Sequence, residues 1–311
     1  MATPDPREYA VVRTAAGRVR GLWRENGDAG RSAAFLGIPF AEAPVGERRF
    51  AAPMPKAPWE GVRDALAFGA TAQRGDPGVT LIPEPSVEGD ETLNVNVFTP
   101  DPDPSTARPV LVWIHGGGYV AGSPASPWYD GRAFNRDGVV TVTISYRLGF
   151  DGFGWIDGAP TNRAVRDWLL ALEWVQQNIA AFGGDPSRVP IAGQSAGGGA
   201  VLTLLGMPAA QHLFHGVYAL SGAFGDVPLS RAESFGRELA AAAGVEPTLA
   251  GFAAVPEERL LALEKERTAL DNVGVADIVE HGLPLGPGVD GDLIPRPTAQ
   301  SLRAGIGADK P

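Results

Sequence analysis

The sequence contains no cysteine among its 311 residues. This excludes disulfide bonds, thiolate nucleophiles and cysteine-based zinc sites. No apolar run approaches the ~20 residues that a membrane-spanning helix needs. The segment Met1–Val12 is mostly polar and carries two prolines, which is unlike a signal peptide. These absences favour a cytoplasmic protein without a membrane partner.

The sequence also has fewer basic than acidic residues. Lys and Arg total 26 against 36 Asp and Glu, a net charge of -10, which argues against nucleic acid or an anionic membrane as a partner. The chain is 44% hydrophobic and 20% charged, as expected of a globular protein with a sizeable core. No repeat or low-complexity linker divides it, so we expect one domain over residues 1–311.

The pattern of apolar runs predicts an α/β fold. Runs that are apolar on both faces are typical of parallel strands covered by helices, and here they alternate with helical patterns. The predicted strands are Tyr9–Arg13, Arg18–Trp23, Ala34–Pro39, Thr92–Phe98, Val110–Ile114, Val139–Ile144, Val189–Ala192 and Val217–Leu220. The predicted helices are Asn162–Phe182, Ala196–Leu205, Ser230–Ala243 and Glu257–Ala269, whereas Ala51–Pro85 reads as loop with short helical pieces and Gly282–Pro297 as loop.

One serine lies in a motif typical of nucleophiles. Gly193-Gln194-Ser195-Ala196-Gly197 matches G-x-S-x-G, follows an apolar run and opens a predicted helix, which is the strand–turn–helix context of a nucleophile elbow. Small residues must flank the serine so that the strand and the helix can approach each other. The helix N-terminus then favours negative charge near Ser195. The alternative is a glycine-rich turn with an incidental serine.

A glycine run earlier in the chain complements this serine. His115-Gly116-Gly117-Gly118-Tyr119 follows a predicted strand and matches the HGGG-type oxyanion motif. We expect the amides of Gly117 and Gly118, together with that of Ala196, to bind a tetrahedral oxyanion. A single such donor is worth ~3 kcal/mol of transition-state stabilisation. The alternative is a plain turn; no Gly-Lys-Ser/Thr sequence follows that would make a phosphate-binding loop.

Further blocks along the chain resemble those of the type-B carboxylesterases, the family of bacterial p-nitrobenzyl esterases and cholinesterases. These further blocks are Phe35–Ala41, Asp90–Val97, Ser145–Gly149, Asn178–Pro186, Ser221–Gly222 and Gly288–Asp292. The two motifs above belong to the same resemblance. The resemblance implies an α/β-hydrolase fold with a mostly parallel central sheet flanked by helices. It also implies carboxylic-ester hydrolysis without metal or cofactor, on a small-molecule ester.

The sequence departs from the family pattern in four respects. Ser145 replaces an asparagine, Gln194 replaces a glutamate that many members have, and Thr92 replaces a disulfide cysteine. In the family the triad acid and histidine follow the Gly288–Asp292 block, whereas here the chain ends at Pro311. We therefore expect the C-terminal strands, the acid and the histidine to lie beyond Pro311, so that activity of this chain alone is uncertain.

A serine nucleophile needs a base to take its proton. The histidines of the chain are His115, His212, His215 and His281. We expect His115 to pack behind the glycine loop. His212 and His215 precede a strand that the family uses structurally, and His281 lies in the loop-rich tail, so none of them is expected to be the base.

The leading hypothesis is therefore ester hydrolysis through an acyl-enzyme on Ser195. For Ser221 two roles stay open: support of the missing acid by a hydrogen bond, as the resemblance implies, or a buried, satisfied serine. The alternative function is a non-catalytic cholinesterase-like binding module or an inactive fragment. Aromatic candidates for a substrate pocket, or equally for the core, are Trp128, Phe153, Trp155 and Phe224.

Overall fold

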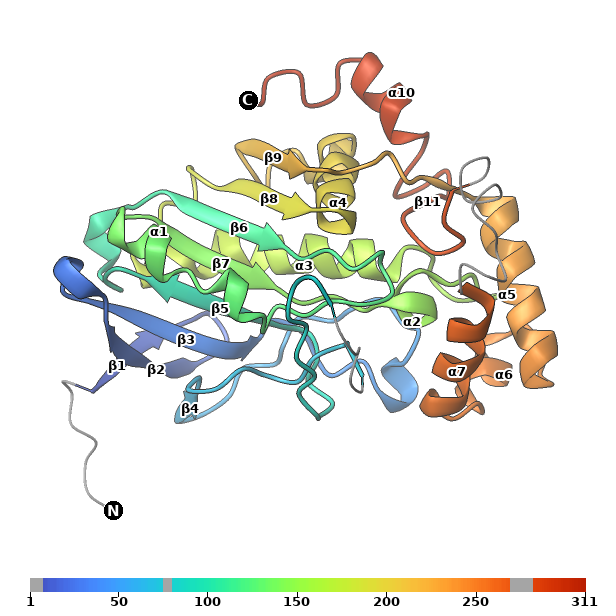
Figure 1. Cartoon of the computed structure of the whole chain (residues 1–311), viewed down its shortest axis with the longest axis horizontal. Coiled ribbons are helices and arrows are strands. Elements are labelled where there is room, and N and C mark those ends of the chain that lie inside the picture. Colours follow the sequence, from blue (N-terminus) through green and yellow to red (C-terminus); the bar gives the residue numbers. More distant parts are fainter. Residues whose placement is uncertain (1–7, 75–79, 269–281) are drawn as a thin grey trace.

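The computed structural model describes residues 8–74, 80–268 and 282–311 (Figure 1). A nine-stranded sheet forms its centre, in the order β1-β2-β3-β5-β7-β6-β8-β9, with β4 paired to β2. The strands are β1 (Tyr9–Arg13), β2 (Arg18–Glu25), β3 (Arg31–Pro39), β4 (Val62–Asp64), β5 (Asn94–Thr99), β6 (Val110–Ile114), β7 (Val140–Ile144), β8 (Pro190–Gln194) and β9 (Gly216–Leu220).

The sheet changes character along its width. From β1 to β7 the neighbours pair antiparallel, whereas β7, β6, β8 and β9 pair parallel, as do β2 and β4. The predicted α/β class is confirmed, but the sheet is mixed rather than mostly parallel. For β1, β2 and β3 the reason is local: these strands follow one another through short turns, and such connections allow antiparallel pairing only.

Helices cover the parallel part of the sheet or lie beyond the carboxyl ends of its strands (Figure 1). They are α1 (Arg132–Arg136), α2 (Gly149–Phe153), α3 (Arg163–Asn178), α4 (Ala196–Leu205), α5 (Leu229–Ala243), α6 (Leu249–Ala253), α7 (Glu257–Thr268) and α10 (Thr298–Arg303). In α3, Val165, Trp168, Leu172 and Val175 are fully buried, because their three- and four-residue spacing puts them on one helix face. The sheet side chains Val112, Val142 and Ile191 complete the core.

The last helices lie apart from the N-terminal strands. Figure 1 shows α5, α6 and α7 beyond the carboxyl ends of β6 and β8, on the far side from β1–β4. Two short strands, β10 (Val227–Pro228) and β11 (Gly288–Val289), pair parallel and connect this group to the tail. No helix in the described ranges is long and apolar enough to cross a bilayer.

Most predicted elements are confirmed, with ends that agree to within four residues. The strands Tyr9–Arg13 and Val110–Ile114 and the helix Ala196–Leu205 have the predicted bounds. The helical pieces expected in Ala51–Pro85 are wrong for its described part, which contains β4 and no helix. Backbone groups of this segment bond instead to the N-terminal strands: Ala65 N donates to Arg20 O at 2.8 Å. Ala269, the predicted end of α7, lies outside the described residues.

Candidate active site

Ser195 occupies a strained turn between β8 and α4. Its backbone has φ 56° and ψ -122°, and such positive φ values are uncommon for residues other than glycine. Its amide donates to Leu220 O on β9 at 2.9 Å, and its carbonyl accepts from Gly199 N at 2.9 Å. Strain of this kind persists only where the surroundings enforce it, and it concentrates at functional sites.

Small residues bring the strand, the helix and the glycine loop into direct contact around Ser195. A Cβ at Gly197 would overlap the carbonyl oxygen of Ile114 at the end of β6. A Cβ at Gly116 would lie 2.6 Å from Gln194 O and 3.2 Å from Ser195 Cβ. The beginning of the glycine loop therefore touches the serine turn, as the two motifs predicted, and neither position has room for a side chain.

The glycine loop turns sharply at Gly117. Gly117 and Gly118 have φ of 112° and 62°, and Val120 N and Ala121 N both donate to Gly117 O, at 3.1 and 2.9 Å. A Cβ at Gly117 would overlap Ala121 O, so this turn requires glycine. We call residues 116–122 the oxyanion loop from here on.

The amides nominated for the oxyanion have no competing acceptors. Among the described residues, Gly117 N and Gly118 N donate no hydrogen bond to the protein. Ala196 N is the first amide of α4 and has no acceptor within its helix. These three amides meet the requirement for an oxyanion site, although their assignment to that role stays a proposal.

His115 lies behind the oxyanion loop, where the residue is 2% exposed. It stacks on Tyr146 with ring centroids 4.4 Å apart, and its Nδ1 lies 2.8 Å from Gly116 O. Burial lowers the pKa of His115 to about 4, against the opposing effect of the Gly116 carbonyl. A neutral, stacked ring bonded to the loop backbone supports the loop rather than exchanging a proton with Ser195.

His212 and His215 lie far from Ser195. Both side chains are exposed, and His215 N donates to Val189 O at 2.9 Å, at the amino ends of β8 and β9. Ser195 follows the carboxyl end of β8, six residues after Val189. At ~3.3 Å per residue along a strand, Ser195 is therefore roughly 20 Å from Val189. These two histidines are on the wrong edge of the sheet for a base. His281 lies outside the described residues.

Of the two roles left open for Ser221, that of a buried, satisfied serine is wrong: its side chain is exposed and its φ is 49°. The reason is its position after β9, the last strand of the described sheet, where Tyr218 is also 62% exposed. The neighbouring Gly222 explains the Ser-Gly block better, since a Cβ there would lie 2.8 Å from Gly198 O on α4. Whether Ser221 supports a triad acid stays a proposal.

The aromatic pocket candidates lie in different surroundings. Phe153 is 6% exposed and packs between Tyr119 and Trp168, with ring centroids 5.1 and 5.9 Å away, so it belongs to the core. Trp128 and Phe224 are 63% and 54% exposed. Trp155 lies under Arg237 of α5, at 5.0 Å from guanidinium carbon to ring centroid.

A cavity of about 610 Å³ lies next to the oxyanion loop instead. The loop contributes Val120 and Ala121, and α7 contributes Leu260 and Leu261, while charged side chains complete the wall. These charged residues are Arg49, Arg74, Asp90, Arg147, Asp151, Glu257, Glu264 and Lys265. None of the four aromatic candidates lines it.

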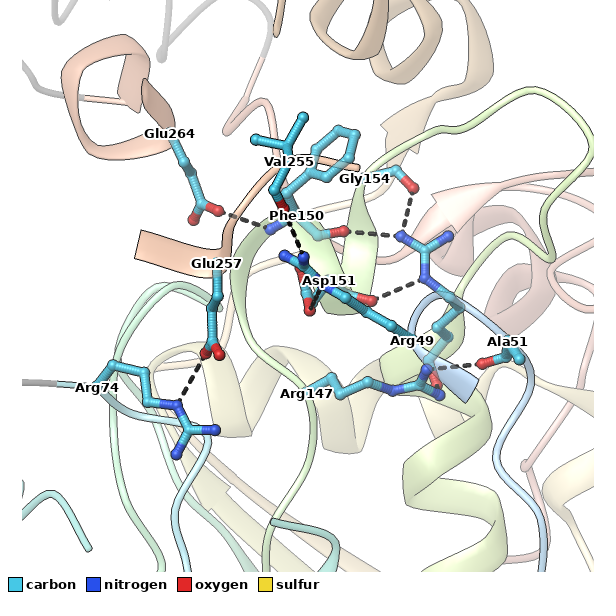
Figure 2. A network of polar contacts seen from close by, with 11 residues as sticks. Arg49, Ala51, Arg74, Arg147, Phe150, Asp151, Gly154, Val255, Glu257 and Glu264 are labelled. Atoms are coloured by element: carbon cyan, nitrogen blue, oxygen red, sulfur yellow. Dashed lines mark hydrogen bonds and ion pairs between the residues drawn. The ribbon is translucent and has the colours of Figure 1, made fainter. Parts of the chain in front are cut away.

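Buried arginines hold the segment after β7 against this cavity. Arg147 forms an ion pair with Asp167 at 2.7 Å, with side chains 4% and 0% exposed. Arg163 donates to the carbonyls of Phe150, Asp151, Pro160 and Gly154, and burial together with Arg147 lowers its pKa to about 9. Figure 2 shows Arg147 and its surroundings.

Two polar residues that line this cavity are not among the site residues predicted from the sequence. Gln73 Oε1 accepts from Gly122 N at 3.0 Å, and Glu264 Oε2 accepts from Phe150 N at 2.9 Å. Glu264 had a detectable signal, because it follows Leu260 by four residues and so shares the buried face of α7. Gln73 had none, since it lies in irregular backbone and contacts a residue 49 positions away.

The chain matches known proteins over most of its length. The profile of the carboxylesterase family matches residues 8–311. Para-nitrobenzyl esterase of Bacillus subtilis is 42% identical over 221 residues, and phenmedipham hydrolase of Pseudarthrobacter oxydans is 42% identical over 215. The aligned parts are 69% and 67% of this chain, but only 44% and 43% of those relatives. The chain thus spans less than half the length of these curated relatives.

The crystal structure of a carboxylesterase from Geobacillus stearothermophilus gives the corresponding structural match. It superposes with a TM-score of 0.81 at 36% identity, covering 96% of this chain and 60% of that one. The antiparallel N-terminal strands, the parallel strands and the serine turn are therefore placed within a recognised architecture.

Proposed function

The chain belongs to the carboxylesterase family and has its α/β-hydrolase fold, and on that premise we propose that it hydrolyses carboxylic esters through an acyl-enzyme on Ser195. The observation that carries the proposal is the strained serine at the N-terminus of α4, in contact with a loop whose amides are free. Acyl transfer requires a nucleophile and an oxyanion site placed together, and a base that takes the proton of the nucleophile.

The reaction assigns a role to each group. Ser195 Oγ attacks the ester carbonyl, and the Gly117, Gly118 and Ala196 amides hold the resulting oxyanion. Their fixed orientation matters more than their number, because preorganised donors need no rearrangement as the charge develops. The intermediate collapses to the acyl-enzyme and expels the alcohol, which takes the proton removed from Ser195. Water then attacks the acyl-enzyme, and the acid leaves as Ser195 Oγ regains a proton.

Proton transfer needs a base that we assign outside the described residues. His115 is neutral and engaged with Gly116 O, and His212 and His215 lie at the opposite edge of the sheet. We propose that a histidine and a carboxylate elsewhere complete the site, with Ser221 near the carboxylate.

The substrate proposed is a small-molecule ester, without nucleic acid or membrane, and the proposed location is cytoplasmic. The relative named para-nitrobenzyl esterase makes para-nitrobenzyl esters the first compounds to test.

The test is an intact mass spectrum before and after treatment with a fluorophosphonate, with Ser195→Ala as control, followed by hydrolysis of a para-nitrobenzyl ester. An adduct and turnover that both vanish in Ser195→Ala are expected. A folded protein that forms no adduct and turns over no ester contradicts catalysis and favours a binding module or an inactive fragment.

A further inference from the structure

The oxyanion loop is hydrogen-bonded to the rest of the molecule at two points after Gly118. Tyr119 O accepts from Gly149 N at 2.8 Å, and Gly122 N donates to Gln73 Oε1 at 3.0 Å. Tyr119 itself has φ 66°, a value that its surroundings must enforce. The position of Gly117 and Gly118 therefore depends on where Gly149 and Gln73 lie.

Both attachment points lie next to a residue that is bonded to helix α7. Phe150, which follows Gly149, donates its amide to Glu264 Oε2 at 2.9 Å. Arg74, which follows Gln73, pairs with Glu257 through its Nε at 2.9 Å. Figure 2 shows Glu264 and Glu257 reaching from α7 toward these two partners.

The contact through Glu264 is the more deeply buried of the two, although both are 2.9 Å long. Glu264 as a residue is 5% exposed, whereas the side chains of Arg74 and Glu257 are 27% and 49% exposed. Gly149 has φ 56°, and a Cβ there would overlap the Glu264 carboxyl group. The carboxyl group therefore packs directly on the peptide that holds Tyr119.

The cavity makes these polar contacts more important. It separates Val120 and Ala121 of the loop from Leu260 and Leu261 of α7. Side chains that line a cavity lose the dispersion contacts of a filled interior, so packing restrains the loop less on this side. The hydrogen bond of Glu264 and the Gly149–Tyr119 bond connect α7 to the loop through buried groups.

We propose that Glu264 is a positioning residue for the oxyanion loop: through the Phe150–Gly149 backbone it holds Tyr119, and with it the Gly117 and Gly118 amides, in the geometry that receives the oxyanion. This inference rests on the proposed function of that loop. Small displacements at such donors matter, because a misplacement of ~1 Å can cost on the order of 10²-fold in rate.

The charged groups near Glu264 pair with other residues or are exposed, so Glu264 acts through its hydrogen bond and not through an ion pair. On α2 it faces Asp151, which pairs with Arg49 at 3.1 Å, and Arg147 pairs with Asp167. Lys265 on α7 is exposed, as is Glu257. Burial, and to a smaller extent Asp151, raises the pKa of Glu264 to about 7, against the effect of Phe150 N. The acid and the carboxylate both retain an oxygen that can accept from Phe150 N.

The first experiment measures amide hydrogen exchange in peptides covering residues 116–122 of the full chain, which requires no catalysis. Glu264→Leu removes the acceptor, and Glu264→Gln keeps one. Glu258→Leu, an exposed change on the same helix, is the matched control. We expect exchange in these peptides to accelerate about tenfold or more in Glu264→Leu, because local opening becomes easier, and to stay near wild type in the other two.

The second experiment measures kcat and KM on a para-nitrobenzyl ester. Glu264→Leu is expected to lower kcat about tenfold with KM nearly unchanged, less than the roughly 10²–10³-fold loss of a whole donor, and Glu264→Gln is expected to restore it. Leu239→Ala, a buried change in α5, controls for general loss of stability and should leave kcat unchanged.

The two readouts separate the possible failures. A wild-type chain without Ser195-dependent turnover contradicts the proposed function, while exchange still decides whether Glu264 holds the loop. Unchanged exchange over residues 116–122 in a folded Glu264→Leu variant overturns the inference. If that variant does not fold, Glu264→Asp retracts the carboxyl group by one methylene and is read in the same way.

Discussion

The oxyanion loop is held differently on its two sides. On the sheet side, backbone meets backbone: positions such as Gly197 and Gly116 have no room for a Cβ. On the α7 side, side chains reach across a cavity of about 610 Å³. Contacts between backbones hardly change with conditions, whereas contacts through carboxyl groups respond to pH and to single substitutions. The first side fixes the site and the second can adjust it.

The ion pairs show the same contrast. Arg147 and Asp167 are 4% and 0% exposed, and Arg74 and Glu257 are 27% and 49% exposed. Breaking a buried pair leaves an uncompensated charge, whereas exposed pairs contribute little because water and salt screen them. Substitutions in the buried and in the exposed contacts test this comparison, and their expected effects range from several kcal/mol to less than ~1 kcal/mol.

Arg147→Met should have the largest effect on stability. It leaves Asp167 buried without its cation, which typically costs ~3–5 kcal/mol. Arg20→Met, which breaks the more exposed pair with Asp64, is the control and should cost less than ~1 kcal/mol. Urea unfolding of both variants measures the difference, and equal costs would remove the distinction between the two kinds of pair.

Gly117→Ala should have the next largest effect, on catalysis. Its Cβ would overlap Ala121 O, so the turn must open and the oxyanion donors move, with an expected loss in kcat of about 10²–10³-fold. At Gly118 a Cβ would meet only Val120 Cγ2 at 3.9 Å, so Gly118→Ala carries mainly backbone strain and about a tenfold loss. Steady-state kinetics of the pair tests this order, and an equal or reversed order would contradict it.

Glu264 should make stability depend on pH. Its pKa in the folded protein is raised from 4.5 to about 7, so the folded state binds the proton more tightly than the unfolded state. The stability of the protonated form is therefore fully present below pH ~4.5 and is lost as pH rises toward ~7.

The measurement is the difference in unfolding free energy between Glu264→Gln and wild type at pH 5 and pH 8. We expect the difference to move by about 2–3 kcal/mol in favour of Glu264→Gln at the higher pH. Glu258→Gln, an exposed change on the same helix, should show no such trend. A pH-independent difference for Glu264→Gln would mean that its carboxyl group is not buried in solution.

Glu257→Gln should have the smallest effect. The pair with Arg74 is partly exposed, so its loss should cost less than ~1 kcal/mol and change kcat less than about twofold, because Gly122 keeps its bond to Gln73. Kinetics and urea unfolding test both values. A larger loss in kcat than that of Glu264→Leu would reverse the ranking of the two contacts from α7.

Local patterns predicted much of this structure. The strand at Val110–Ile114, the helix at Ala196–Leu205 and the turn at Ser195 each depend on a few consecutive residues, and such signals are visible in a single sequence. The segment Ala51–Pro85 was misjudged, because its backbone groups bond to strands far away in the chain, as Ala65 does to Arg20.

The sequence by itself determined which catalytic groups the chain contains: a serine in G-x-S-x-G, a glycine loop after a strand, no cysteine and few histidines. Residue type and spacing suffice for these, because a turn without side chains is a local property. Only the tertiary structure decided that Ser221 is exposed, that His212 and His215 lie at the far edge, and that Glu264 contacts Phe150. These facts depend on which segments meet, and burial and contact between residues over a hundred positions apart arise only when the chain has folded.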